Sequence, residues 1–122
     1  MKTILILDDF ESSAWITTQT LKQLNAKFIT CTDSIVALNH FLNNEDIDLL
    51  ITDLNMPKMN GIELIQKIKY IEKYFTLPVI ILTTEIKEEM KLKANEVGVT
   101  KWIQKPFKVN ELKSIVEKIL RF

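Results

Sequence analysis

The chain has 122 residues, of which 47% are hydrophobic and 26% charged, and these values are typical of one globular domain rather than a disordered or fibrous chain. Sixteen basic residues balance sixteen acidic ones, so the composition offers no electrostatic surface for nucleic acid or an anionic membrane. A single cysteine excludes an internal disulfide, and every apolar run is far shorter than the ~20 residues that span a bilayer.

The first part of the chain alternates strand-like and helix-like segments. The apolar run Thr3–Leu7 predicts a strand, and Lys27–Cys31 is a second β-prone run. Asp33 follows this second run and is a residue type that caps helices. The apolar positions at helical spacing are Ile16, Leu21 and Leu24 in the first predicted helix, and Ala37, Leu38, Phe41 and Leu42 in the second.

The middle of the chain repeats this alternation. Leu49–Asp53 predicts the third strand, and the segment Met56–Gly61 has proline, asparagine and glycine in turn positions. A third helix follows, with apolar residues at Ile62, Ile65, Ile68 and Ile71.

The last part of the chain contains two more strands and two more helices. Pro78 precedes the fourth strand, Val79–Leu82, and Gly98 is a plausible C-terminal cap that separates the fourth helix from the fifth strand, Val99–Gln104. The apolar positions are Ile86, Met90, Ala94 and Val97 in the fourth helix, and Leu112, Ile115, Val116, Ile119 and Leu120 in the fifth.

Five strand–helix units predict an α/β fold of the (βα)₅ type, in which right-handed crossovers place helices on both faces of a doubly wound five-stranded parallel sheet. Polar residues follow four of the strands: Asp8 and Asp9, then Asp53, Thr83 and Lys105. The carboxyl ends of parallel strands share one edge, where open α/β sheets bind ligands. We therefore expect these five side chains to form one site.

Three neighbouring carboxylates cannot all remain ionised without a counter-charge, so either the pKa of one rises or a cation binds, and we expect a cation. Oxygen ligands favour Mg²⁺ over Zn²⁺, and His40 and Cys31 lie on other predicted elements. Two charges from Mg²⁺ and one from Lys105 would balance the three carboxylates. Because Mg²⁺ usually keeps sites for water and phosphate oxygens, the pattern indicates phosphoryl chemistry.

An aspartate can accept a phosphoryl group while a metal, a lysine and a hydroxyl hold the phosphoryl oxygens. Asp53 is the candidate acceptor because it stands alone after the central strand. Thr83 and Lys105 are the candidate partners of the phosphoryl oxygens, and Asp8 and Asp9 are the candidate metal ligands.

These residues also match a family. Along nearly its whole length the chain resembles the receiver domain of bacterial response regulators, and within that family it looks most like CheY-type chemotaxis regulators. The matching motifs are Ile-Leu-Asp8-Asp9, Ile-Thr-Asp53-Leu-Asn-Met-Pro57, Asn60-Gly61, Leu-Thr83-Thr84 and Trp102-Ile-Gln-Lys105-Pro106-Phe107.

The resemblance implies the strand order 2-1-3-4-5 of CheY and flavodoxin. It implies that a histidine kinase phosphorylates Asp53. It also implies that Mg²⁺ is bound by Asp9, Asp53 and the main-chain carbonyl of Asn55, and by Asp8 through water. A cis Lys105-Pro106 bond is implied as well, since X-Pro bonds adopt cis at low cost.

The family pattern extends to the output of the signal. Thr83 and Trp102 are implied to form a switch pair, and Thr84 to lie beside the phosphate. An output protein would bind the face formed by the fourth helix, fifth strand and fifth helix. Asn55 and Glu85 would tune the lifetime of the phosphate, and polar residues there suggest a short-lived mark.

The chain departs from the family pattern at three positions. Phe10 replaces a small polar residue, which could alter access to the metal. Asn60 stands where aspartate is commonest, and Thr84 is larger than the usual alanine or glycine. Either of these two could slow phosphotransfer.

Residue by residue, other interpretations stay open. The Asp8–Asp9 pair could be a charge pair at a helix N-terminus, Lys105 a solvated loop lysine, Thr83 a helix cap and Trp102 ordinary packing.

Other functions also stay open. A Mg²⁺-dependent phosphatase of the haloacid dehalogenase kind would use an aspartate nucleophile in an Asp-x-Asp motif after the first strand. Here the acids after the first strand are adjacent, and the candidate nucleophile follows the third strand. A flavodoxin-like nucleotide binder would need glycine-rich loops, and the chain has two glycines. The chain could also be a receiver domain cut from a larger regulator or hybrid kinase. We expect a cytoplasmic monomeric receiver domain over residues 1–122 that signals and does not turn over an external substrate.

Overall fold

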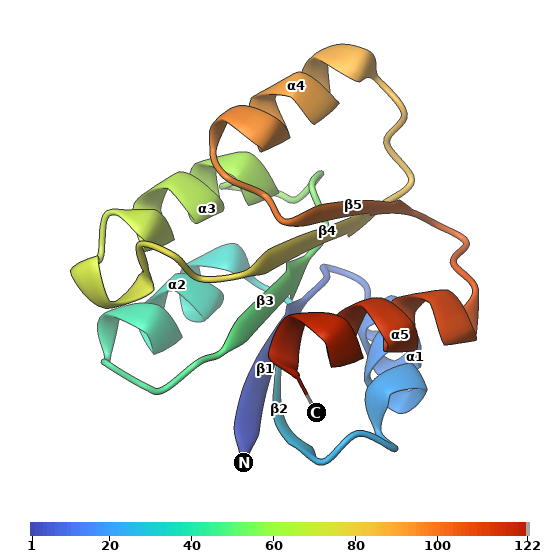
Figure 1. Cartoon of the computed structure of the whole chain (residues 1–122). Coiled ribbons are helices and arrows are strands. Elements are labelled where there is room, and N and C mark those ends of the chain that lie inside the picture. Colours follow the sequence, from blue (N-terminus) through green and yellow to red (C-terminus); the bar gives the residue numbers. More distant parts are fainter. Residues whose placement is uncertain (122) are drawn as a thin grey trace.

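The computed structural model describes residues 1–121, which fold as a five-stranded parallel sheet between two layers of helices (Figure 1). The strand order is β2-β1-β3-β4-β5, which confirms the predicted α/β topology. The strands are β1 (Lys2–Leu7), β2 (Ala26–Cys31), β3 (Leu49–Thr52), β4 (Val79–Thr83) and β5 (Lys101–Gln104).

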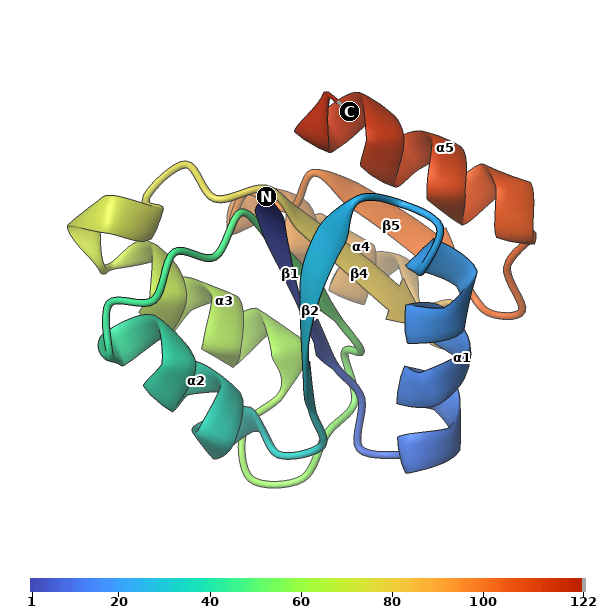
Figure 2. The same ribbon diagram turned by 90° about the horizontal axis from the view of Figure 1, so that it is seen from below.

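The helices cover both faces of the sheet. Figure 2 shows α1 and α5 on one side of the strands, with α2 and α3 on the other, where α4 also packs. The helices are α1 (Glu11–Leu21), α2 (Ser34–Leu42), α3 (Gly61–Lys69), α4 (Glu88–Glu96) and α5 (Val109–Leu120), with a 3₁₀ turn at Glu72–Tyr74. Among residues 1–121, no helix is long and apolar enough to cross a membrane.

The alternation of side chains along each strand divides the core in two. In β1, Ile4 and Ile6 pack toward α1 and α5, while Leu5 and Leu7 pack toward α2 and α3. All four residues of β3 are buried, as expected for a central parallel strand with helices on both faces. The site at the sheet edge therefore rests on strands that have little freedom to shift.

Two helix positions differ from the sequence prediction. Ile16 is 53% exposed, because the buried stripe of α1 is instead Ala14, Thr17 and Leu21. Leu42, on α2, is also exposed.

The starts of the fourth helix and the fifth strand also differ from the sequence prediction. Ile86 precedes α4 and is exposed. The fifth strand begins at Lys101 rather than Val99, because the amide of Val99 donates to the Ala94 carbonyl at the end of α4. Gly98 has φ +83°, which confirms it as the left-handed residue after this helix.

Candidate functional site

The carboxyl ends of β1 and β3 bring three acidic side chains together. Asp8, Asp9 and Asp53 each offer an oxygen, and these oxygens all lie within 4.8 Å of one another. Asp8 is buried, whereas Asp9 and Asp53 are partly exposed. The site is thus open to solvent on the side of Asp9 and Asp53, where a ligand could enter.

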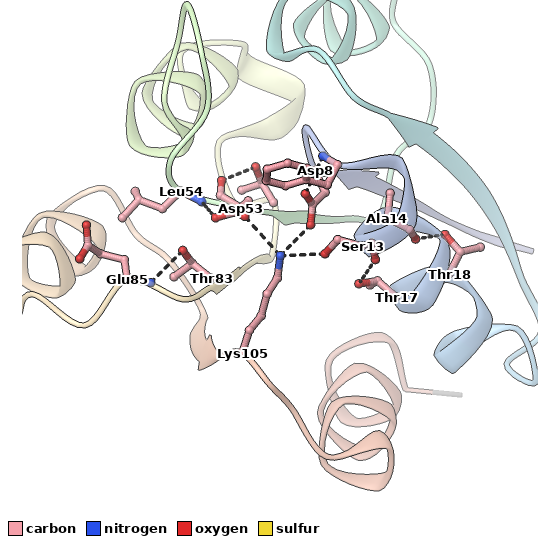
Figure 3. Close-up of polar contacts among 12 residues, drawn as sticks. Asp8, Ser13, Ala14, Thr17, Thr18, Asp53, Leu54, Thr83, Glu85 and Lys105 are labelled. Atoms are coloured by element: carbon pink, nitrogen blue, oxygen red, sulfur yellow. Dashed lines mark hydrogen bonds and ion pairs between the residues drawn. The ribbon is translucent and has the colours of Figure 1, made fainter.

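Lys105, in the loop after β5, neutralises part of this charge (Figure 3). Its Nζ lies 2.7 Å from Oδ2 of Asp8 and 3.2 Å from Oδ2 of Asp53. Burial alone would lower the pKa of this ammonium, but the hydrogen bond to Asp8 and the charge of Asp53 together raise the pKa above its ordinary value. Lys105 is therefore a cation bound between two acids, and the solvated-loop interpretation is wrong. The Lys105-Pro106 bond is cis, as predicted.

The backbone around Asp53 fixes the direction of its carboxylate. The amide of Leu54 donates to Oδ1 at 2.6 Å, while Oδ2 faces Lys105. Gly61 passes so close that a Cβ at this position would lie 2.5 Å from the Asp53 carbonyl oxygen. The glycine of the Asn60-Gly61 motif is therefore required by the close approach of two backbone segments.

The loop after Asp53 is held at its far end and in its middle. At its far end, Asn60 and Glu63 form a reciprocal capping box at the start of α3, so asparagine at position 60 serves as the cap. In the middle, Lys58 has φ +71° and its Nζ lies 2.9 Å from Oδ2 of Asp33. Asp33 also caps α2, which confirms its predicted role.

Thr83, at the end of β4, is fully buried, and its Oγ1 accepts a hydrogen bond of 3.2 Å from the amide of Glu85. Asn55 reaches across from the β3 loop, and its Nδ2 donates to Oε1 of Glu85 at 3.4 Å. Desolvation opposes ionisation of Glu85, but this bond and the nearby amides lower its pKa below the ordinary value. Thr84 is exposed beside this group.

Trp102 lies away from the acidic cluster but on the same sheet face as Thr83. It pairs with Ile81 of β4, two residues before Thr83, and packs against the core beneath α4. Its Nε1 is buried without an acceptor in the part of the chain that the structure describes, and Nζ of Lys91 lies 6.0 Å from the ring centroid. A buried donor without an acceptor is costly in the folded state.

The donor set fits a hard divalent cation. Oδ1 of Asp9 is buried, and no group within residues 1–121 donates a hydrogen bond to it. A buried carboxylate oxygen without a donor is costly unless a cation occupies the space in front of it. The three carboxylates, which are all oxygen ligands, match the preference of Mg²⁺.

Sequence reasoning missed one residue of this site. Oγ of Ser13, in the first turn of α1, accepts a hydrogen bond of 2.9 Å from Nζ of Lys105 (Figure 3). The available signal was its position four residues after Asp9, in the first turn of the helix that follows the acidic pair.

A comparison with protein families agrees with this geometry. The sequence model of the response regulator receiver domain matches residues 4–117. The chain belongs to the receiver domain family.

Individual receiver proteins are similar over almost the whole chain. The CheY homologue of Campylobacter jejuni is 36% identical over 118 residues, which cover 96% of this chain and 91% of that protein. CheY-3 of Vibrio cholerae is 36% identical over 116 residues, covering 95% and 89%. The solved structure of the chemotaxis protein CheY4 of Vibrio cholerae superposes with a TM-score of 0.89 at 30% identity and covers 98% of each chain. This receiver domain is therefore CheY-like.

Proposed function

We propose that this receiver domain accepts a phosphoryl group on Asp53 from the phosphohistidine of a sensor histidine kinase and thereby switches an output surface. The supporting observation is the position of Asp53, whose Oδ2 lies 3.2 Å from the Lys105 ammonium within a cluster of three acids. The position of Asp53 in the receiver match, residues 4–117, supports the same assignment.

In the proposed transfer, Oδ2 or Oδ1 of Asp53 forms a bond to phosphorus while the bond from phosphorus to the donor nitrogen breaks. The imidazole of the donor keeps the electron pair of that bond and takes up a proton. Lys105 stays ionised at neutral pH, because its pKa is raised, and stabilises the charge on the phosphoryl oxygens. Thr83 and the exposed Thr84 would donate hydroxyl hydrogens to other oxygens.

We propose Mg²⁺ as the cofactor, bound by Asp9, Asp53 and the main-chain carbonyl of Asn55, and by Asp8 through water. When bound, Mg²⁺ would neutralise the acids and bind phosphoryl oxygens. Asp8 already accepts hydrogen bonds from Lys105 and from the amide of Phe10, which favours an indirect role. The unpaired oxygen of Asp9 favours a direct one.

The similarity to CheY proteins supports a chemotaxis-type signal. We propose that the output protein binds the face made by α4, β5 and α5, and that Thr83 and Trp102 connect this face to Asp53. Asn55 and Glu85 would set the lifetime of the phosphate. The domain would act as a signal carrier that undergoes its own phosphorylation and dephosphorylation.

The test is labelling with acetyl phosphate and Mg²⁺. The wild type should gain one acid-labile phosphate, and Asp53→Asn should gain none. Asp46→Asn is the matched control, because Asp46 is exposed and pairs with Lys73 outside the acidic cluster. Full labelling of Asp53→Asn would refute the assignment. Sustained release of phosphate from an added phosphomonoester would favour a phosphatase instead.

A further inference from the structure

Ser13 and Lys105 are 92 positions apart in the sequence, yet their side chains are in hydrogen-bond contact. Ser13 is half-buried in the first turn of α1, with its Oγ directed at the Lys105 ammonium (Figure 3). Lys105 is only 16% exposed, so water has limited access to replace the hydroxyl. This contact connects the first helix to the loop after the last strand.

The three hydrogens of the Lys105 ammonium match three acceptors. They are Oδ2 of Asp8 at 2.7 Å, Oγ of Ser13 at 2.9 Å and Oδ2 of Asp53 at 3.2 Å. The two shorter contacts come from the β1–α1 side of the site. The longest contact is the one to Asp53, so this hydrogen is the one that can pass to a phosphoryl oxygen while the other two contacts remain.

We propose that Ser13 is a positioning residue for phosphoryl transfer, because its hydroxyl binds one hydrogen of Lys105 and so aims another at Asp53. This inference rests on the proposed function of Asp53. Lysine has a flexible four-carbon stem and a compact charge, so two carboxylates alone leave the ammonium free to rotate between them. The hydroxyl supplies a third, uncharged acceptor that fixes its orientation without adding negative charge.

The chain offers a matched control in Ser12, the preceding residue, which is exposed on the same helical turn. Ser12→Ala and Ser13→Ala change helix propensity equally, so any difference between them reports the contact with Lys105. Ser13→Thr keeps the hydroxyl and is the conservative rescue variant.

The experiment measures the rate of Asp53 labelling by acetyl phosphate with Mg²⁺ in excess. Ser13→Ala should label about three to ten times more slowly, the factor that corresponds to one net hydrogen bond. Ser12→Ala and Ser13→Thr should label within about twofold of the wild type. Equal rates in Ser13→Ala and the wild type, or equally slow rates in Ser13→Thr, would overturn the proposal.

A second measurement does not depend on phosphorylation. At one fixed pH, NMR should show that the ammonium hydrogens of Lys105 exchange with water faster in Ser13→Ala than in Ser12→Ala. Unchanged exchange would overturn the positioning role. A wild type that exchanges slowly but never labels would instead refute the proposed function of Asp53, so the two failures are distinguishable.

Discussion

The Lys105 ammonium lies closer to Asp8 than to the candidate phosphoryl acceptor, with distances of 2.7 Å and 3.2 Å. The two acids share one cation, and Asp8 has the shorter contact with it. Asp9 differs from both, since its Oδ1 accepts no hydrogen bond from any donor among the first 121 residues. The three acids of the cluster therefore differ in what they cost the folded state.

Asp9→Asn should stabilise the protein in the absence of divalent ions, because it removes a like charge that has no counter-ion. We expect a gain of about 1 kcal/mol in the free energy of unfolding in EDTA, measured by urea denaturation. Added Mg²⁺ should stabilise the wild type, by about 2.7 kcal/mol at a hundred times its dissociation constant, and should have little effect on the variant. A variant less stable than the wild type in EDTA would contradict this account.

Thr83→Ala should uncouple Trp102 from phosphorylation. A switch from 1:99 to 99:1 needs roughly 5.5 kcal/mol, more than one hydroxyl hydrogen bond supplies, so Thr83 acts as the link while charged groups provide most of the energy. We expect Asp53 to be labelled in Thr83→Ala without the fluorescence change of Trp102.

Two controls make this measurement specific. Trp15 is 63% exposed and would add fluorescence of its own, so every protein should contain Trp15→Phe. Thr76→Ala, an exposed threonine before β4, should retain the coupling. If Trp102 still responds fully in Thr83→Ala, then Trp102 is ordinary packing.

Gly61→Ala should damage both stability and phosphorylation. A Cβ here meets the Asp53 carbonyl oxygen at 2.5 Å, and backbone cannot move aside as a flexible side chain can. We expect a loss of roughly 1 to 3 kcal/mol in thermal or urea unfolding, together with slower labelling of Asp53.

Gly98→Ala is the matched control for Gly61→Ala. The φ of Gly98, +83°, costs an alanine about 1 to 2 kcal/mol. The atoms nearest to its added Cβ belong to the flexible end of the Lys69 side chain and not to the backbone of Asp53. This variant should lose stability and label at the wild-type rate. Equal labelling by both glycine variants would show that Gly61 does not position Asp53.

Cys31 should make the fold sensitive to alkali. Burial, with the charges of Glu45 and Asp33, raises the pKa of this thiol to about 11 from 9.0. Between these two values the unfolded chain releases the proton and the folded one keeps it, so stability falls as pH rises from about 9 to 11. The fall should be smaller in Cys31→Ala, measured by urea unfolding at each pH.

Folded Cys31 should also react slowly with thiol reagents at pH 8, and rapid labelling of the thiol would contradict its burial.

The order of elements was predictable because buried parallel strands are almost purely apolar, as in Leu49–Ile51, and each is followed by a capping or turn residue. The boundaries were less predictable. Ile16 was assigned to the core from its hydrophobicity, yet the buried stripe of α1 includes Thr17, whose hydroxyl is satisfied by the Ser13 carbonyl at 3.2 Å. Such local hydrogen bonds let a polar residue be buried where the apolar one is not.

Asp8, Asp9, Asp53, Thr83 and Lys105 were predictable as a group because each ends a strand or closely follows one. The contact between Asn55 and Glu85 and the tether between Asp33 and Lys58 were not, since each joins loops from different strands. Ser13 was missed for the same reason. Its partner lies at the other end of the chain, and no periodicity relates the two positions.

The site lies at the carboxyl ends of four parallel strands, and the hydrogen bond from Lys105 to Asp8 joins positions 97 apart in the sequence. A chain that has assembled only β1 to β4 has its acids but lacks their lysine. If Asp53 is the phosphoryl acceptor, a nascent, truncated or partly unfolded copy would lack the cation that stabilises the phosphoryl oxygens. Under the proposed function, the site would therefore become able to accept a phosphoryl group only when the loop after the last strand has been placed.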